Sequence, residues 1–195
     1  MDQLHRVLLI SGSLRRASTN TAVLATARAV APPSMTMAFY EGAAGLPHFN
    51  PDDDEPPRPP LVEEFRATIR SADAVLFSTP EYAGGLPGSF KNVLDWAVGD
   101  EQVGSLNGKA VAWINASPRG AADAHAALRK VLGYLGANIV EDACIEVPVG
   151  SSAIGSDGQI ASPEVHQQLA SALLRLQAAL PSQEDSSEGE AFEPD

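Results

Sequence analysis

The chain has 195 residues, of which 44% are hydrophobic and 19% charged, a composition that suits one packed domain. Its formal net charge of −12 disfavours nucleic acids and anionic membranes as partners. Cys144 is the single cysteine, which excludes an internal disulfide and a cysteine-rich zinc site. The apolar run near the N-terminus is shorter than a signal sequence or a membrane span, so we expect a cytoplasmic protein.

The first half of the chain alternates strand and helix patterns. Residues 6–10 form a continuous branched apolar run, which predicts a strand buried on both faces, and 35–40 and 74–79 predict two more strands. Apolar residues recur at helical spacing from 23 to 30 and again from residue 61. The stretch 41–60 is rich in Gly, Pro and Asp, which predicts a surface loop.

The second half continues the alternation. After a loop at 80–88 we expect a helix containing Phe90, a strand at 109–115, a helix at 121–135, a strand at 138–147 and a helix at 162–180. Ser162 is the predicted N-cap of the last helix, with Pro163 at its first position.

This order predicts an α/β fold: one flavodoxin-like, doubly wound domain over residues 1–181, with a five-stranded parallel sheet of order 2-1-3-4-5 and helices on both faces. Residues 182–195 contain six acidic residues and neither Lys nor Arg. We expect them to form an acidic, disordered tail, because they cannot bury enough apolar surface to offset the entropy of ordering.

In such a sheet, ligands bind beyond the carboxyl ends of the strands, so the loops after the first, third and fourth strands should meet. The first loop offers hydroxyls, a guanidinium group and a helix start with unpaired N–H groups, a set that suits a phosphate monoester. It lacks the glycine patterns of dinucleotide-binding and Mg-nucleotide loops. The alternative is a polar helix start with solvent-facing arginines. The candidate residues of this loop are Ser11, Ser13, Arg15, Ser18, Asn20 and Thr21.

Two motifs in the chain resemble those of one enzyme family. Gly12-Ser13-x-Arg15-x-x-Ser18-x-Asn20 resembles the G-S-x-R-x-x-S-x-N phosphate loop of the NAD(P)H-dependent FMN reductase family, a flavodoxin-like group that includes quinone, azo-dye and chromate reductases. Residues 79–96 resemble its T-P-E-Y-N-x-x-x-P-G…K-N-x-x-D-W motif, and residues 46–52 resemble its loop after the second strand. The resemblance extends from about Val7 to Leu180.

The resemblance implies FMN as the cofactor, bound by residues of all three loops. Its phosphate would contact the first loop, and its isoalloxazine ring would lie along Pro80, Glu81, Tyr82, Ala83 and Gly84. The third flavin loop would contain Ser117, Arg119 and Gly120. The chain departs from the family at Ala83, where Asn is usual, and at residues 119–122, where paired glycines are common.

The implied function is an oxidoreductase that passes two electrons from NADPH or NADH through FMN to an acceptor such as free flavin, a quinone, an azo compound or a metal oxyanion. Flavin N5 would carry the chemistry, so no catalytic side chain is expected. The alternatives are a one-electron carrier flavodoxin and a non-catalytic flavin-binding or regulatory module.

We expect a homodimer or homotetramer, with the helix of Phe90 and Trp96 as the subunit contact. The four histidines show no metal-ligand spacing, so no metal site is predicted.

Overall fold

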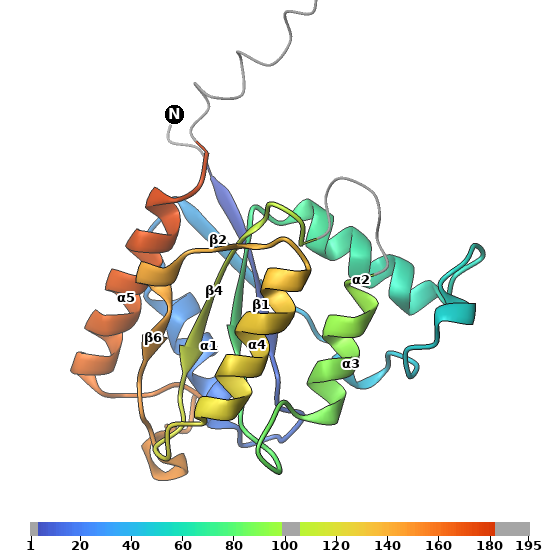
Figure 1. The fold of residues 1–195 in the computed structure, drawn as a ribbon. Helices are drawn as coiled ribbons and strands as arrows, with labels where there is room; N and C mark the ends of the chain where they lie inside the picture. Colours follow the sequence, from blue (N-terminus) through green and yellow to red (C-terminus); the bar gives the residue numbers. More distant parts are fainter. Residues whose placement is uncertain (1–3, 99–105, 182–195) are drawn as a thin grey trace, which may run out of the picture.

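The computed structural model describes residues 4–98 and 106–181 and forms a twisted parallel sheet between two layers of helices (Figure 1). The strands are β1 (His5–Ser11), β2 (Met35–Phe39), β3 (Ala74–Ser78), β4 (Ala110–Asn115), β5 (Asn138–Ile139) and β6 (Ile145–Glu146). Their order is β2-β1-β3-β4-β5, with β6 also paired to β4, and all these pairs are parallel. The predicted order of the sheet is therefore confirmed.

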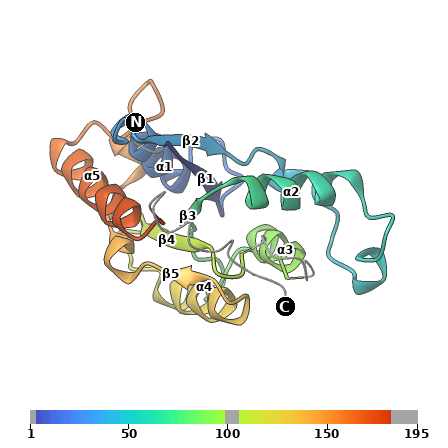
Figure 2. The ribbon, with the colours of Figure 1, turned by 90° about the horizontal axis from the view of Figure 1, so that it is seen from above.

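In the part of the chain that the structure describes, five helices cover the two faces of the sheet. They are α1 (Thr19–Ala29), α2 (Pro60–Ser71), α3 (Gly88–Trp96), α4 (Ala122–Tyr134) and α5 (Pro163–Ala178). Figure 2 shows α1 and α5 on one face and α2, α3 and α4 on the other. Ser162 accepts a hydrogen bond from the Val165 N–H and Pro163 opens α5, as predicted. Within the described residues, none of the helices has both the length and the apolar character that crossing a membrane requires.

The central strands are buried on both faces, which explains their continuous apolar runs. Every residue of β3 and β4 is buried. Along β3, Leu76 packs into the cluster that contains α1 and α5, while its neighbour Phe77 packs into the cluster that contains α2 and α3. Successive side chains point to opposite faces, so both helical layers receive apolar contacts from the same strand.

The fifth strand differs from the prediction, because residues 138–147 do not form one continuous strand. A 3₁₀ turn at Glu141–Ala143 separates β5 from β6. The register pairs Val111 with Ile139 and Ile114 with Ile145, so three extra residues lie between the two paired points. The turn accommodates them and places Ala143 in the core with α5. The acidic pair Glu141 and Asp142, which interrupts the apolar residues of this stretch, lies in the turn.

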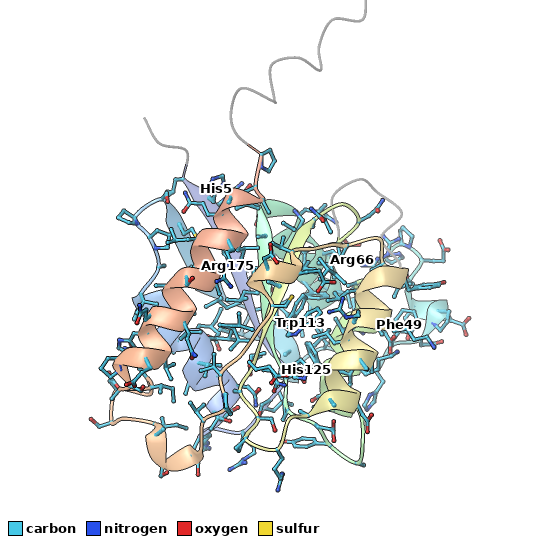
Figure 3. All side chains as sticks on the ribbon, turned by 60° about the vertical axis from the view of Figure 1, so that its left-hand side comes forward. His5, Phe49, Arg66, Trp113, His125 and Arg175 are labelled. Atoms are coloured by element: carbon cyan, nitrogen blue, oxygen red, sulfur yellow. The ribbon has the colours of Figure 1, made fainter. Side chains whose placement is uncertain are left out.

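The predicted loop at 41–60 contains short 3₁₀ turns, Gly42–Ala44 and Pro51–Asp53, and α3 anchors it. Asn92 Oδ1 accepts from the Phe49 N–H at 2.7 Å, and Asn92 Nδ2 donates to Pro47 O at 2.9 Å. Trp96 Nε1 donates to the same oxygen at 2.7 Å, and its ring meets that of Phe49 edge-on (Phe49 is labelled in Figure 3). The resemblance motif K-N-x-x-D-W therefore has a structural role here.

A buried guanidinium group fixes the far end of the same loop. Arg66 is 1% exposed, and its Nε donates to the Trp96 carbonyl oxygen at 2.9 Å. Its Nη1 lies 2.7 Å from Asp54 Oδ1.

Phe90 and Trp96 are themselves buried in this chain's own core, so neither ring is available to a partner subunit. The predicted reason for α3 as the subunit contact, its aromatic rings, is therefore wrong.

Candidate functional site

The loops after β1, β3 and β4 lie together beyond the carboxyl edge of the sheet, at the lower edge of Figure 1. Residues of these loops enclose a cleft. The cleft has a cavity volume of about 200 Å³ and opens to solvent. Its lining residues are Ser13, Arg15, Ser18, Thr19, Asn20, Pro80, Glu81, Tyr82, Ser117, Pro118, Arg119 and Ala121. Thr19, Pro118 and Ala121 were not among the predicted site residues.

The first loop presents hydrogen-bond donors to the cleft. Ser13 Oγ accepts from the Arg15 N–H at 3.3 Å, and Ser18 Oγ caps α1 by accepting from the Thr21 N–H at 3.4 Å. Because both hydroxyl oxygens already accept backbone hydrogens, their own O–H groups remain available to donate into the cleft. Together with the start of α1 and the guanidinium group of Arg15, this donor set suits a phosphate dianion.

Ser11 and Thr21 do not line the cleft but brace the loop behind it. Their hydroxyl oxygens lie 2.9 Å apart, and Ser11 Oγ also accepts from the Ser13 N–H at 3.2 Å. Asn20 lines the cleft and is 6% exposed, with its Oδ1 3.0 Å from Ser78 Oγ. This contact fixes the amide of Asn20 against β3 and leaves its nitrogen as a donor for the cleft.

Gly12 allows the first loop to lie against the end of β3, where the second loop begins. Its N–H donates to Ser78 O at 2.8 Å. A Cβ atom at this position would lie 2.3 Å from Thr79 Oγ1 and 2.6 Å from Thr79 Cβ, so only glycine fits without moving one of the loops.

The second loop contains a tight turn from Tyr82 to Gly85. Their backbone groups exchange hydrogen bonds of 3.0 and 3.1 Å, and the two residues between them have positive φ, 50° at Ala83 and 72° at Gly84. This is the turn geometry that favours Asn-Gly. Ala83 and Gly84 are at the exposed tip and do not line the cleft, whereas Tyr82 lines it with 47% of its surface exposed.

Glu81 connects the second loop to the third. Its Oε2 accepts from the N–H groups of Asp123 and Ala124 at 3.0 and 3.1 Å. The N-cap residue of α4, Ala121, has no side chain that can accept a hydrogen bond, so Glu81 supplies the missing cap from 42 positions earlier in the chain. A carboxylate is also favoured there by the helix dipole.

The third loop is held by Asn115, the last residue of β4, which is 3% exposed. Its Oδ1 accepts from the Ser117 N–H at 3.0 Å, and its Nδ2 donates to Gly120 O. Ser117 Oγ accepts from the Arg119 N–H at 3.2 Å. Gly120 has a φ of 89° and turns the chain without lining the cleft. The signal that could have revealed Asn115 is a polar residue that ends a wholly apolar strand.

The charges around the cleft favour an anionic ligand. Arg15 and Arg119 line it from opposite loops and are exposed. Among the described lining residues the one carboxylate is that of Glu81, which is occupied by the N-terminus of α4. The cleft is therefore a locally positive region on a chain whose formal net charge is −12.

Comparison with known proteins agrees with this geometry. The family model described as NADPH-dependent FMN reductase matches residues 5–151. The chain is 35% identical over 174 residues to an NAD(P)H-dependent FMN reductase of Pseudomonas aeruginosa, covering 88% of this chain and 93% of the relative. It is 35% identical over 152 residues to a quinone reductase of Pseudomonas putida, covering 76% and 77%.

Among solved structures, the flavoenzyme FerB, an NAD(P)H:acceptor oxidoreductase of Paracoccus denitrificans, superposes with a TM-score of 0.78 at 27% identity, covering 91% of this chain and 100% of that one. The family match spans all three loops of the cleft. The chain therefore belongs to the NADPH-dependent FMN reductase family.

Proposed function

We propose that the three-loop cleft is where this protein, an FMN-dependent NAD(P)H oxidoreductase, binds its flavin and passes two electrons from NAD(P)H to a small-molecule acceptor. The observation that carries this assignment is the donor set of the first loop, in which the Ser13 and Ser18 hydroxyls and the Arg15 guanidinium group converge at the start of α1. Such a set matches the terminal phosphate of FMN.

When bound, FMN supplies the redox chemistry, and the residues of the chain bind and orient it. Ser13, Arg15 and Ser18 would hold the phosphate, and the Asn20 amide nitrogen adds a further donor. Ser117 and Arg119 would bound the ring side of the cleft together with Pro80 and Tyr82. The predicted site residues that do not line the cleft, such as Ser11 and Gly84, would act through the shape of the loops.

One feature favours a reductase over a one-electron carrier. Tyr82 is the one aromatic residue among the described lining residues, and the turn beyond it consists of Ala83, Gly84 and Gly85. A lining with a single aromatic ring would leave space beside the flavin for a second planar molecule. NAD(P)H and the acceptor would then occupy the same space in turn, each close enough for transfer.

The acceptor is proposed from the chemistry of the relatives. A quinone reductase and an FMN reductase are among them, so quinones and free flavins are the first acceptors to test, followed by azo compounds and metal oxyanions.

We also propose that the protein acts in the cytoplasm, where NAD(P)H is supplied. Subcellular fractionation of the source cells would test this location.

We further propose that copies of the chain form a homodimer or homotetramer. The exposed face of α3 and α4 forms a groove whose lining residues are Phe49, Leu86, Lys91, Asp95, Val98, Ala127, Lys130, Val131 and Tyr134. Tyr134 is 81% exposed, although a large aromatic ring gains much from burial. The apolar groove supports subunit contact through this face.

The test of the flavin site is the Arg15→Ala variant. It removes a charge-assisted contact worth roughly 1.5–3 kcal/mol, so the Kd for FMN should rise about 10–150-fold. Riboflavin, which lacks the phosphate, should bind the variant and the parent equally. Fluorescence titration measures both, and Arg16→Ala is the matched control because Arg16 is exposed in the same loop but does not line the cleft. Equal FMN affinity of Arg15→Ala and the parent would refute the phosphate assignment.

A further inference from the structure

The wall of the cleft formed by the third loop depends on an alanine in an unfavourable conformation. Ala121 has φ 48° and ψ 42°, in the left-handed region that favours glycine. It follows Gly120, whose φ is also positive, and the pair turns the chain from the cleft into α4. Ala121 is 4% exposed and lines the cleft, so its position determines the shape of that wall.

The carbonyl group of Ala121 is held by one residue through two contacts. The backbone N–H of His125 lies 3.2 Å from this oxygen, and the ring Nδ1 of His125 lies 2.8 Å from it. Because a carbonyl oxygen only accepts, Nδ1 must carry the hydrogen in this contact. The ring thus adds a side-chain contact to the ordinary backbone bond of the first helical turn.

The surroundings of the ring indicate that this contact is the reason for a histidine at position 125. His125 is 9% exposed, and its Nε2 is buried without a hydrogen-bond partner in the described part of the chain. The ring lies beside Trp113, with the ring centroids 6.3 Å apart (both are labelled in Figure 3). Burying an unpaired ring nitrogen is unfavourable, so an apolar residue would suit the site better if filling space were its only task.

We propose that His125 is a positioning residue of the flavin site: its Nδ1–H fixes the Ala121 carbonyl group and so holds a left-handed turn that a second glycine would otherwise provide. Asn115 and Glu81 hold the chain on either side of this turn, at residues 117–120 and at 123–124. The inference rests on the proposed assignment of the cleft to FMN.

The test compares three replacements of His125 by FMN titration. His125→Asn keeps an N–H donor at the position of Nδ1, and its Kd should stay within about threefold of the parent value. His125→Leu removes the donor, and His125→Gln moves it to the position of Nε2. Losing one well-placed hydrogen bond should raise the Kd about tenfold in both variants.

A second arm uses Ala121→Gly, which makes the left-handed conformation inexpensive. In this background His125→Leu should raise the Kd for FMN by less than about threefold, because the turn no longer depends on the ring. Thermal melting of the flavin-free variants reports global stability separately. If His125→Leu does not fold, the comparison of His125→Asn with His125→Gln decides.

Two results would overturn the inference. One is a His125→Leu variant that melts at a lower temperature yet binds FMN as tightly as the parent, which would mean that the ring only fills space. The other is an equal loss in the His125→Leu variant with and without Ala121→Gly. Arg15→Ala is measured in parallel: if it too leaves FMN binding unchanged, the assignment of the cleft fails instead.

Discussion

Glu81 lies in a motif that resembles flavin-lining loops, yet both contacts of its carboxylate are with N–H groups of α4. The caps supplied by Ser162 to α5 and, within three residues, by Ser18 to α1 follow from local sequence rules, because donor and acceptor are near in the chain. A cap supplied from 42 residues away has no such signal. The role of a residue was therefore predictable where its hydrogen-bond partner is near in the sequence. It was not predictable where the partner is distant in the sequence and becomes a neighbour only in the fold.

The turn at Ala83 offers a prediction about stability. Ala83→Asn should raise the free energy of unfolding by about 0.5–1 kcal/mol, since Asn tolerates the left-handed conformation that Ala83 adopts at φ 50°. Urea denaturation measures the change. Gly84→Ala is the opposing control: its φ is 72° and no atom lies within 4 Å of an added Cβ, so it should destabilise through conformation alone. Changes of the same sign in both variants would contradict the argument.

Burial controls the reactivity of Cys144. Burial raises the pKa of the Cys144 thiol to about 11, from the ordinary value of 9.0. Below that pH the thiol stays protonated, so the reactive thiolate should be about 100-fold scarcer than in the unfolded chain. We expect slow alkylation by iodoacetamide at about pH 8, faster reaction as the pH approaches the pKa, and rapid reaction in urea. Equal rates for the folded and the urea-unfolded protein would contradict this.

At the scale of elements, the predictable part of the fold is what burial dictates. The central strands carry uninterrupted apolar runs because both of their faces are covered, and this pattern predicted β1, β3 and β4. The alternation of strands and helices predicted the order of the sheet. The break between β5 and β6 was not predicted, although Glu141 and Asp142 interrupt the apolar pattern there. Both halves are short and pair with β4, and the three extra residues fold into a turn that is itself partly buried.

The loops after β1 and β3 lie so close together that adding one methyl group between them should disturb their packing. Gly12→Ala places a Cβ 2.3 Å from Thr79 Oγ1, so we expect a destabilisation of about 1–3 kcal/mol and weaker FMN binding. Urea denaturation and FMN titration measure the two effects. Gly88→Ala, at the first residue of α3 with no atom near an added Cβ, should be neutral or slightly stabilising. A Gly12→Ala variant as stable as the parent would show that the loops can separate freely.

For the whole molecule, the net charge is negative, whereas the charge around the cleft is positive. The chain carries −12 overall, while Arg15 and Arg119 line the cleft, so we expect the anionic flavin and dinucleotide to be drawn to this end of the sheet. The predicted acidic tail at 182–195 contributes −6 to this net charge; it lies outside the described residues and stays a prediction. Composition predicts the sign of the net charge of the chain, but it does not predict where the cationic side chains lie.

We expect copies of the chain to associate through the α3–α4 groove, and this expectation can be tested on the whole molecule. Leu86 lines this groove and belongs to the same loop as Tyr82 of the cleft, so a subunit seated there would support the second flavin loop from behind. Light scattering should give the parent the mass of two or four chains. Tyr134→Glu places a charge in the groove at a side chain that is 81% exposed, so it should lower the mass without unfolding the subunit.

Leu174→Glu is the matched control, because Leu174 is a 57% exposed apolar residue on α5, which covers the opposite face of the sheet (Figure 2). It should leave the mass unchanged, since adding a charge to an exposed position outside the groove removes no subunit contact. If the two variants behave alike, or if the parent has the mass of one chain, the α3–α4 face is not the contact. If Tyr134→Glu alone dissociates and also binds FMN more weakly, the second loop depends on its neighbour for its shape, and flavin affinity should rise with protein concentration.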